Sequence, residues 1–317
     1  MEMEERLERI KEWIKGKAGP LLVEIWPTNR CNLNCMMCGT WATRRKMEER
    51  GIKYDPAEEA KNEVSEKRLV ELVKESIELD AKEFLITGGG EPFMRKSTTL
   101  RLMDEIKSFD AFGNLNTNGT LLKKEDIKKI VEMKWDMIMF SINAPFASIH
   151  DKIANVKGCF EKVKENLLFI KKEKKRMKSE RPKIVFNTVL SNLIYDKIDK
   201  LIEFASYVDC ESITFIPLIP YDEQARKLEL NKKEKKELSK KIKEFLKISE
   251  KLRVNTNLKD LDLSVSSGKM NEVMLREIKK MPNDIFHSPC YEPFLHLLVK
   301  ANGEATFCCM VEGSPEN

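Results

Sequence analysis

The sequence has no apolar run of the length that a membrane-spanning helix needs. Such a helix takes about 20 consecutive apolar residues, and charged residues, 34% of this chain, interrupt every stretch before that length. The N-terminus, Met-Glu-Met-Glu-Glu-Arg, is acidic and lacks the apolar core of a signal peptide. These absences predict a globular cytoplasmic protein with no membrane span.

A strong excess of charge of one sign is also absent. The chain has 57 lysines and arginines against 52 aspartates and glutamates, which leaves +5 over 317 residues. The lysines are spread over helical stretches, as at Lys123-Lys124 and Lys232-Lys233, and we interpret them as solvated helix faces. We therefore expect no nucleic-acid partner. A tRNA-modifying enzyme would need a basic face or an RNA-binding domain, and is a less favoured interpretation.

The sequence does have a closely spaced cysteine triplet. Cys31, Cys35 and Cys38 form the pattern C-x-x-x-C-x-x-C directly after the apolar, strand-like stretch 21–26. Cysteine thiolates are the usual ligands of iron–sulfur clusters and also bind zinc. A cube-shaped cluster has four irons, so three cysteines leave one iron open to a substrate or cofactor. The spacing therefore favours chemistry over a purely structural role.

Zinc and inert thiols are the alternatives for this triplet. Structural zinc almost always takes four ligands, commonly from two C-x-x-C-like pairs. No fourth cysteine or histidine is near in the sequence, because the next ones are His150 and Cys159. Half a zinc knuckle and a group of buried thiols both stay open at this point.

A second motif lies at residues 84–92, Phe-Leu-Ile-Thr-Gly-Gly-Gly-Glu-Pro. An apolar strand leads into three glycines, which allow a ligand to approach the backbone closely. The strand edge and the Glu91 carboxylate offer acceptors to a positively charged amine. A glycine run alone most often forms a tight turn. Its position after the first strand-and-helix unit that follows the cysteines makes the signal stronger.

Together the two motifs resemble the radical S-adenosylmethionine (radical SAM) enzymes. That family carries C-x-x-x-C-x-x-C after its first barrel strand and G-G-E-P at the end of its second, and the resemblance covers nearly the whole chain. It implies that Cys31, Cys35 and Cys38 hold a 4Fe–4S cluster whose unique iron chelates the amine and carboxylate of S-adenosylmethionine (SAM). It also implies that the methionine amino group is lined by Gly89, Gly90, Glu91 and Pro92.

Further stretches match the family at later strand ends. Asn116-Thr-Asn-Gly119 corresponds to its T-N-G, and Ser141-Ile-Asn143 stands where the family usually has S-x-D. Val189 on the fifth strand and residues 216–218 on the sixth lie near the expected ribose and adenine positions. The cofactor-binding residues implied in this way are Asn118, Ser141, Asn143, Asn187 and Leu218.

Two positions depart from the family pattern. Met37 stands where an aromatic residue is common, and its apolar side chain can still pack on adenine. Ala154 stands where some members have an arginine that contacts the cofactor carboxylate. Lys152 and Lys157 are the candidates to replace that arginine.

The order of strands and helices predicts the fold. Strand-like runs alternate with helical ones, which implies a parallel sheet, and we expect an α/β fold, a partial (β/α)6 TIM-like barrel with a small C-terminal β-hairpin extension. Every motif above falls at a carboxyl strand end, where barrel active sites lie. The predicted strands are 21–26, 83–87, 113–116, 136–141, 183–190 and 211–216. The predicted helices are near 65–79, 97–108, 123–133, 159–173, 196–206 and 231–250.

Segments outside the barrel have their own predictions. Residues 1–18 hold an amphipathic helix, expected to cover the barrel bottom, and the barrel itself is expected over 19–255. The charged segment 41–63 is interpreted as a lid, a docking surface or a solvated excursion. Residues 256–317 are expected to form a linker helix and an extension.

The C-terminal segment predicts a hairpin, with strands 294–300 and 305–309 around Asn302-Gly303. Its cysteines resemble the start of a SPASM or twitch extension, which implies a second iron–sulfur cluster. Buried free thiols are the alternative. The ligands of the second cluster would be Cys290, Cys308 and Cys309. Cys159 and Cys210 lie away from the motifs and are interpreted as core residues.

The resemblance implies a radical SAM enzyme that cleaves SAM reductively to a 5′-deoxyadenosyl radical, which abstracts hydrogen from a C–H bond of the substrate. Peptide or protein modification and small-molecule dehydrogenation are the expected reactions, with a step in cofactor or lipid biosynthesis as the alternative. A non-enzymatic iron–sulfur or zinc scaffold or electron carrier is the rival class. The expected partners are a reductant such as ferredoxin or flavodoxin and a peptide or small-molecule substrate, with Tyr221, Asn187 and Arg226 as candidate substrate contacts.

Overall fold

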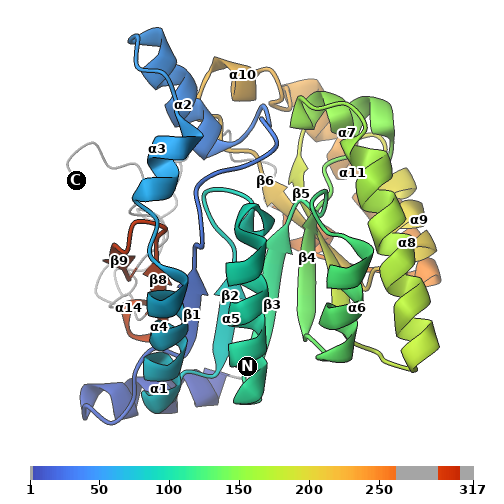
Figure 1. The fold of residues 1–317 in the computed structure, drawn as a ribbon. Helices are drawn as coiled ribbons and strands as arrows, with labels where there is room; N and C mark the ends of the chain where they lie inside the picture. The colour runs from blue at the N-terminus through green and yellow to red at the C-terminus, as the bar shows by residue number, and fades with distance from the viewer. Residues whose placement is uncertain (1–2, 262–291, 308–317) are drawn as a thin grey trace, which may run out of the picture.

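A single nine-stranded sheet organises the chain in the computed structural model, which describes residues 3–261 and 292–307. Its strand order is β7-β6-β5-β4-β3-β2-β1-β8-β9, and all neighbouring pairs are parallel except β8 and β9 (Figure 1). The strands are β1 Leu22–Ile25, β2 Glu83–Ile86, β3 Phe112–Thr117, β4 Met137–Ser141, β5 Lys183–Leu190, β6 Ser212–Pro217, β7 Asn255–Thr256, β8 His296–Val299 and β9 Ala305–Thr306. The predicted parallel α/β fold is confirmed, and within the described residues the sheet does not close into a full barrel.

Helices cover one face of this sheet (Figure 1). They are α4 Glu66–Glu78, α5 Lys96–Ser108, α6 Lys124–Glu132, α8 Cys159–Met177, α9 Ile198–Tyr207 and α11 Lys232–Leu252, and the short helix η1 Pro92–Arg95 precedes α5. The strands β2, β3 and β4 alternate in burial because successive side chains point to opposite faces. On β3, for example, Leu115 is fully buried in the core, whereas Asn114 and Asn116 on the other face are only half-buried. The apolar core thus lies between sheet and helices, and the other face of the sheet is mixed, with Leu85 and Met139 beside the two asparagines.

The charged segment 41–63 is not an irregular loop. It contains most of α2, Gly39–Glu49, and all of α3, Pro56–Lys61. Asp55 starts α3 as its N-cap, with its carboxylate accepting a hydrogen bond from the Ala57 amide at 2.8 Å. The prediction of a long charged excursion missed these helices because their exposed faces carry most of the charge. Two short helices were also missed, α7 Ala147–Ala154 and α10 Glu223–Arg226.

The N-terminal helix packs against the start of the described C-terminal segment. Helix α1, Met3–Ile14, contacts the short helix α14, Glu292–Leu295, and Ile10 packs with Leu21 and Leu295. Leu21 and Leu295 directly precede β1 and β8. The N-terminal helix therefore covers the amino-terminal ends of these strands, as the amphipathic pattern predicts.

The C-terminal hairpin belongs to the main sheet. Strand β8 pairs in parallel with β1, so that Glu24 lies opposite Leu298, and β9 returns antiparallel after a turn at Asn302-Gly303. Gly303 has φ of 89°, a conformation that favours glycine. The pairing with β1 was not predicted, because the sequence pattern identifies strands but not their distant partners. The cysteines Cys290, Cys308 and Cys309 lie outside the described residues, and the domain boundaries stay predictions.

No helix in residues 3–261 or 292–307 is both long enough and apolar enough to cross a membrane.

Gly113 on β3 gives a test of the packing beneath the site. A Cβ atom there would lie 2.2 Å from Cη2 of Trp135, a fully buried side chain. We expect Gly113→Ala to lower the free energy of unfolding by about 1–3 kcal/mol, measured by urea denaturation, because overpacking forces the core to shift. The cost should be smaller in a Trp135→Phe background, where the ring is smaller. Equal costs in both backgrounds would contradict this contact.

Candidate functional site

The three cysteines lie on the loop between β1 and α2. Cys38 is the N-cap of α2, so it stands where the cysteine loop enters that helix. The Cys38 amide donates a hydrogen bond to the Cys35 carbonyl at 3.2 Å, and Cys31 Sγ accepts one from the Leu33 amide at 3.4 Å. All three side chains are half-buried. The loop thus holds three thiols near the carboxyl end of β1.

Burial keeps two of these thiols protonated. It raises the pKa of Cys31 to about 11 and that of Cys35 well above its ordinary value. Apolar surroundings cause this effect, because Leu33, Ala154 and Cys159 pack against the loop. Cys159 therefore lies beside the triplet, and the prediction that it lies away from the motifs is wrong. A metal centre that binds here would displace the thiol protons.

The glycine loop after β2 touches the cysteine loop. The Glu91 amide donates a hydrogen bond to the Arg30 carbonyl at 2.8 Å, and a Cβ on Gly90 would lie 2.2 Å from that same oxygen. A Cβ on Gly89 would lie 2.7 Å from Asn29 Oδ1. Glycine is needed here because any side chain would separate the two loops. The run is therefore more than a tight turn.

Glu91 joins this glycine loop to the end of β3. Its carboxylate is buried and accepts hydrogen bonds from Thr117 Oγ1 at 2.6 Å, the Asn118 amide at 2.7 Å and the Phe93 amide at 3.1 Å. Burial raises the pKa of Glu91, and the three donors oppose that rise. The sequence interpretation offered this carboxylate to an amine ligand. In the structure three protein donors already bond to its oxygens, and its role toward an amine stays a prediction.

Asn118 connects the turn after β3 back to the cysteine loop. Its side-chain Nδ2 donates to Asn32 Oδ1 at 3.0 Å, and its side-chain Oδ1 accepts from Thr120 Oγ1 at 2.6 Å. The cysteine, glycine and T-N-G segments, which are separate in sequence, thus form one hydrogen-bonded unit.

The end of α7 supports the cysteine loop from another side. The Met36 amide donates to the Ile153 carbonyl at 2.9 Å, and the Asn34 amide to the Ala154 carbonyl at 3.2 Å. Ala154 is buried against the loop, while Lys152 and Lys157 are exposed. The position where some family members have an arginine is therefore closely packed in this chain.

The other predicted residues lie at the ends of β4 to β6. Ser141 and Asn187 are direct neighbours across β4 and β5. Asn143 is buried, and its side-chain oxygen accepts a hydrogen bond from the Val189 amide at 3.0 Å. Leu218 is buried just beyond β6, and Met37 is half-buried in the cysteine loop. These residues share the strand-end edge with the cysteines, and their roles toward a cofactor stay predictions.

Arg45 is a residue of this site that the sequence did not indicate. Its guanidinium pairs with Asp222 at 2.7 Å and donates to Asn34 Oδ1 at 3.2 Å and to the Met36 carbonyl at 3.3 Å. Beside it, the Tyr221 ring lies 3.2–3.4 Å from the position of a Cβ on Gly39. The segment after β6 is thus fixed onto the cysteine loop after β1.

The donors and acceptors present fit a 4Fe–4S cluster with SAM. Three cysteines gather in an apolar setting, and Asn29 Oδ1 is buried without a hydrogen-bond partner beside the glycine backbone. An ammonium group is the kind of donor that such an acceptor lacks. Across residues 3–261 and 292–307, no three histidine, cysteine or acidic side chains converge closely enough to hold a single metal ion.

Comparison with known proteins decides the family. The model of the Radical SAM superfamily matches residues 25–205, more than half of the chain. This chain belongs to the radical SAM superfamily.

Two curated proteins illustrate what the chain is similar to. The chain is 26% identical over 205 residues to the AdoMet-dependent heme synthase of Methanosarcina barkeri, a match that covers 63% of this chain and 51% of the relative. It is 24% identical over 202 residues to the tungsten-containing aldehyde ferredoxin oxidoreductase cofactor-modifying protein of Pyrococcus furiosus, covering 61% and 50%. The chain therefore matches about half the length of these curated relatives.

A solved structure shares the fold. SuiB of Streptococcus suis bound to S-adenosylmethionine has a TM-score of 0.66 at 14% identity, covering 99% of this chain and 66% of SuiB. SuiB is also known bound to its precursor peptide SuiA. At this identity the match supports the fold alone, namely the partial barrel expected for a radical SAM protein.

The Arg45–Asp222 contact of this radical SAM protein can be tested by amide hydrogen exchange. In Arg45→Gln we expect exchange in residues 31–38 and 219–228 to become about 10-fold faster, because a hydrogen-bonded charge contributes about 1.5–3 kcal/mol. The control is Arg226→Gln, which removes an exposed ion pair with Glu223 on α10 and should change little. Equal exchange rates in Arg45→Gln and the wild type would contradict the contact.

The burial of His150 predicts how the stability of the fold depends on pH. Its Nδ1 accepts a hydrogen bond from the Asn143 amide at 3.2 Å, and burial lowers its pKa to about 4 from the ordinary 6.5. Below pH 6.5, His150 binds a proton in the unfolded chain but stays neutral in the folded chain. The free energy of unfolding therefore falls as the pH drops from 6.5 to about 4. The loss from this group is about 3 kcal/mol over that window.

Urea denaturation at pH 7 and pH 4.5 measures this loss. We expect His150→Gln to have a clearly shallower pH dependence than the wild type, although other groups titrate in both. The same slope in the two proteins would show that His150 is not held neutral.

Proposed function

We propose that this chain is an enzyme that binds a 4Fe–4S cluster and SAM, and uses them to abstract hydrogen from a C–H bond of its substrate. The hydrogen-bonded union of the cysteine, glycine and T-N-G segments supports this most directly. When bound, the cluster and SAM supply one-electron cleavage of the sulfonium bond, which yields methionine and a 5′-deoxyadenosyl radical.

The residues of the chain have distinct roles in this proposal. Cys31, Cys35 and Cys38 ligate three irons. The glycine backbone and the unpaired oxygen of Asn29 receive the methionine amine. We propose that Asn187 and Leu218 lie near the ribose and adenine, that Met37 packs on the adenine, and that Ser141, Asn143 and Asn118 also contact the cofactor.

Water is kept from this site by the segment after β6. Arg45 and Asp222 fix that segment onto the cysteine loop, and both side chains are largely buried. Excluding water protects a reactive intermediate from side reactions.

The relatives support a proposal for the substrate class. A heme synthase and a cofactor-modifying protein are among the curated relatives, and SuiB is known with a precursor peptide. We infer a peptide or a small molecule as the substrate, with cofactor or lipid biosynthesis as the alternative. Ferredoxin or flavodoxin is the proposed reductant. A second cluster on Cys290, Cys308 and Cys309 would take the electron back from a substrate radical.

Anaerobic reconstitution tests the proposal. We expect about four irons per chain, and 5′-deoxyadenosine when dithionite and SAM are added. Cys35→Ala should abolish 5′-deoxyadenosine formation. Cys210→Ala is the matched control, because Cys210 is buried at the amino-terminal end of β6, away from the site, and should retain it. Close to eight irons would support the second cluster.

Three outcomes would contradict the proposal. Zinc in place of iron would favour a structural site, and iron without SAM cleavage would favour an electron carrier or scaffold. Equal activity in Cys35→Ala and Cys210→Ala would show that the triplet is not the ligand set.

A further inference from the structure

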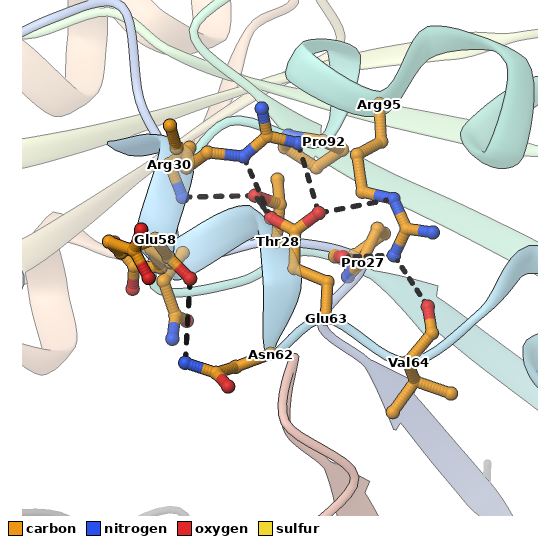
Figure 2. A network of polar contacts seen from close by, with 12 residues as sticks. Pro27, Thr28, Arg30, Glu58, Asn62, Glu63, Val64, Pro92 and Arg95 are labelled. Carbon is orange, nitrogen blue, oxygen red and sulfur yellow. Dashed lines mark hydrogen bonds and ion pairs between the residues drawn. The ribbon is translucent and has the colours of Figure 1, made fainter. Parts of the chain in front are cut away.

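Glu63, between α3 and α4, is a buried carboxylate that the proposed function does not use. Its side chain is 5% exposed and receives the Arg30 guanidinium in a bidentate pair, Nε at 2.8 Å and Nη2 at 2.9 Å (Figure 2). Thr28 Oγ1 donates to the same carboxylate, and Arg95 Nε lies 3.4 Å from it. The Glu63 carboxylate thus contacts two guanidinium groups and one hydroxyl group.

Each of these partners belongs to a segment of the site. Arg30 directly precedes Cys31, and its carbonyl accepts the Glu91 amide at 2.8 Å. Arg95 ends η1, the short helix that begins at Pro92 of the glycine motif. Arg95 Nη1 donates to the Pro27 carbonyl at 2.8 Å, which ties that helix to the chain just beyond β1. Glu63 therefore connects the cysteine loop with the far end of the glycine loop.

The charges make this connection depend on Glu63. The Arg30 and Arg95 side chains are only 21% and 14% exposed, so water screens them poorly. Without the carboxylate, the negative charge that both guanidinium groups face would be gone, and Arg30 would also lose its bidentate acceptor. Removing one partner of a buried ion pair strongly destabilises the fold, because the remaining charge stays buried without a partner. Bidentate pairing also fixes the orientation of Arg30, not only its position.

We propose that Glu63 is a positioning residue that sets the separation between Cys31 and the Gly89-Gly90 backbone, and so sets the affinity of the cluster-loaded protein for SAM. This rests on the proposed function, because SAM must reach the cluster and the glycine backbone at once. Glu63 touches neither group. It acts through Arg30, as residues behind metal ligands do in other sites.

Val64, the residue after Glu63, is hydrogen-bonded to the C-terminal hairpin. The Val64 amide donates to the Ala301 carbonyl at 2.8 Å, and Arg95 Nη1 donates to the Val64 carbonyl at 2.9 Å (Figure 2). The hairpin turn after β8 is therefore fixed to the residue that follows Glu63, which gives the carboxylate a rigid base.

Glu63→Gln tests the proposal, with Asp136→Asn as the matched control. Asp136 is also a buried carboxylate between two cations, Lys107 at 2.9 Å and Arg181, but it lies at the amino-terminal end of β4, opposite the site. Both variants remove a buried negative charge that pairs with two cations. Only one of them lies beside the cysteine loop.

The readouts are iron content, thermal stability and SAM affinity of reconstituted protein. SAM affinity is measured by equilibrium dialysis and by the change that SAM causes in the electron paramagnetic resonance spectrum of the reduced cluster. We expect both variants to lose stability and keep iron. SAM Kd should rise about 10-fold or more in Glu63→Gln, with a weaker spectral change, and stay unchanged in Asp136→Asn.

Each outcome decides the matter. An unchanged Kd in Glu63→Gln, or an equal rise in both variants, would overturn the positioning role while the proposed function stands. A wild-type protein that holds iron but never binds SAM would overturn the proposed function and this inference with it. Should Glu63→Gln fail to retain iron, Thr28→Val removes a hydroxyl that donates to the same carboxylate and accepts the Arg30 amide at 3.0 Å. A raised Kd there supports positioning through Arg30, and an unchanged Kd refutes it.

Discussion

The buried carboxylate of Glu91 is the constraint on which the rest of the site depends. It accepts two backbone amides and one hydroxyl, which come from its own loop and from the end of β3. A carboxylate so enclosed needs all of its donors, because a buried charge without partners is costly. The loops after β2 and β3 are therefore held in one arrangement. The Glu91 amide then bonds to the Arg30 carbonyl and places the cysteine loop against that frame.

The cysteine loop has no regular structure of its own, so its neighbours must fix its shape. Arg30 pairs with Glu63 on one side, and Arg45 pairs with Asp222 on another. The carboxyl end of α7 receives two of its amides. Each support comes from a different part of the chain. This arrangement leaves the three thiols on a rigid loop, which suits a cluster that must stay in register with a bound cofactor.

Much of this could be predicted from the sequence because the signals are local. The six main strands were each found within a residue or two, and the cysteine and glycine motifs were placed correctly at strand ends. The features that the sequence does not predict are contacts between residues that are far apart in the chain. Arg45 and Asp222 are 177 residues apart, and nothing in their surroundings marks them as partners. The position of Cys159 beside Cys35 and the pairing of β8 with β1 are tertiary facts of the same kind. The eight-residue α7 is too short to show a clear helical period.

In the proposed function, SAM binds the unique iron of a cluster on Cys31, Cys35 and Cys38 through its methionine amine. Electron–nuclear double resonance on the reduced, reconstituted protein with SAM labelled with ¹⁵N at that amine detects this bond. We expect a ¹⁵N coupling that appears with the labelled SAM and is absent with unlabelled SAM. A protein with its iron in place and SAM bound, but with no such coupling, would contradict it.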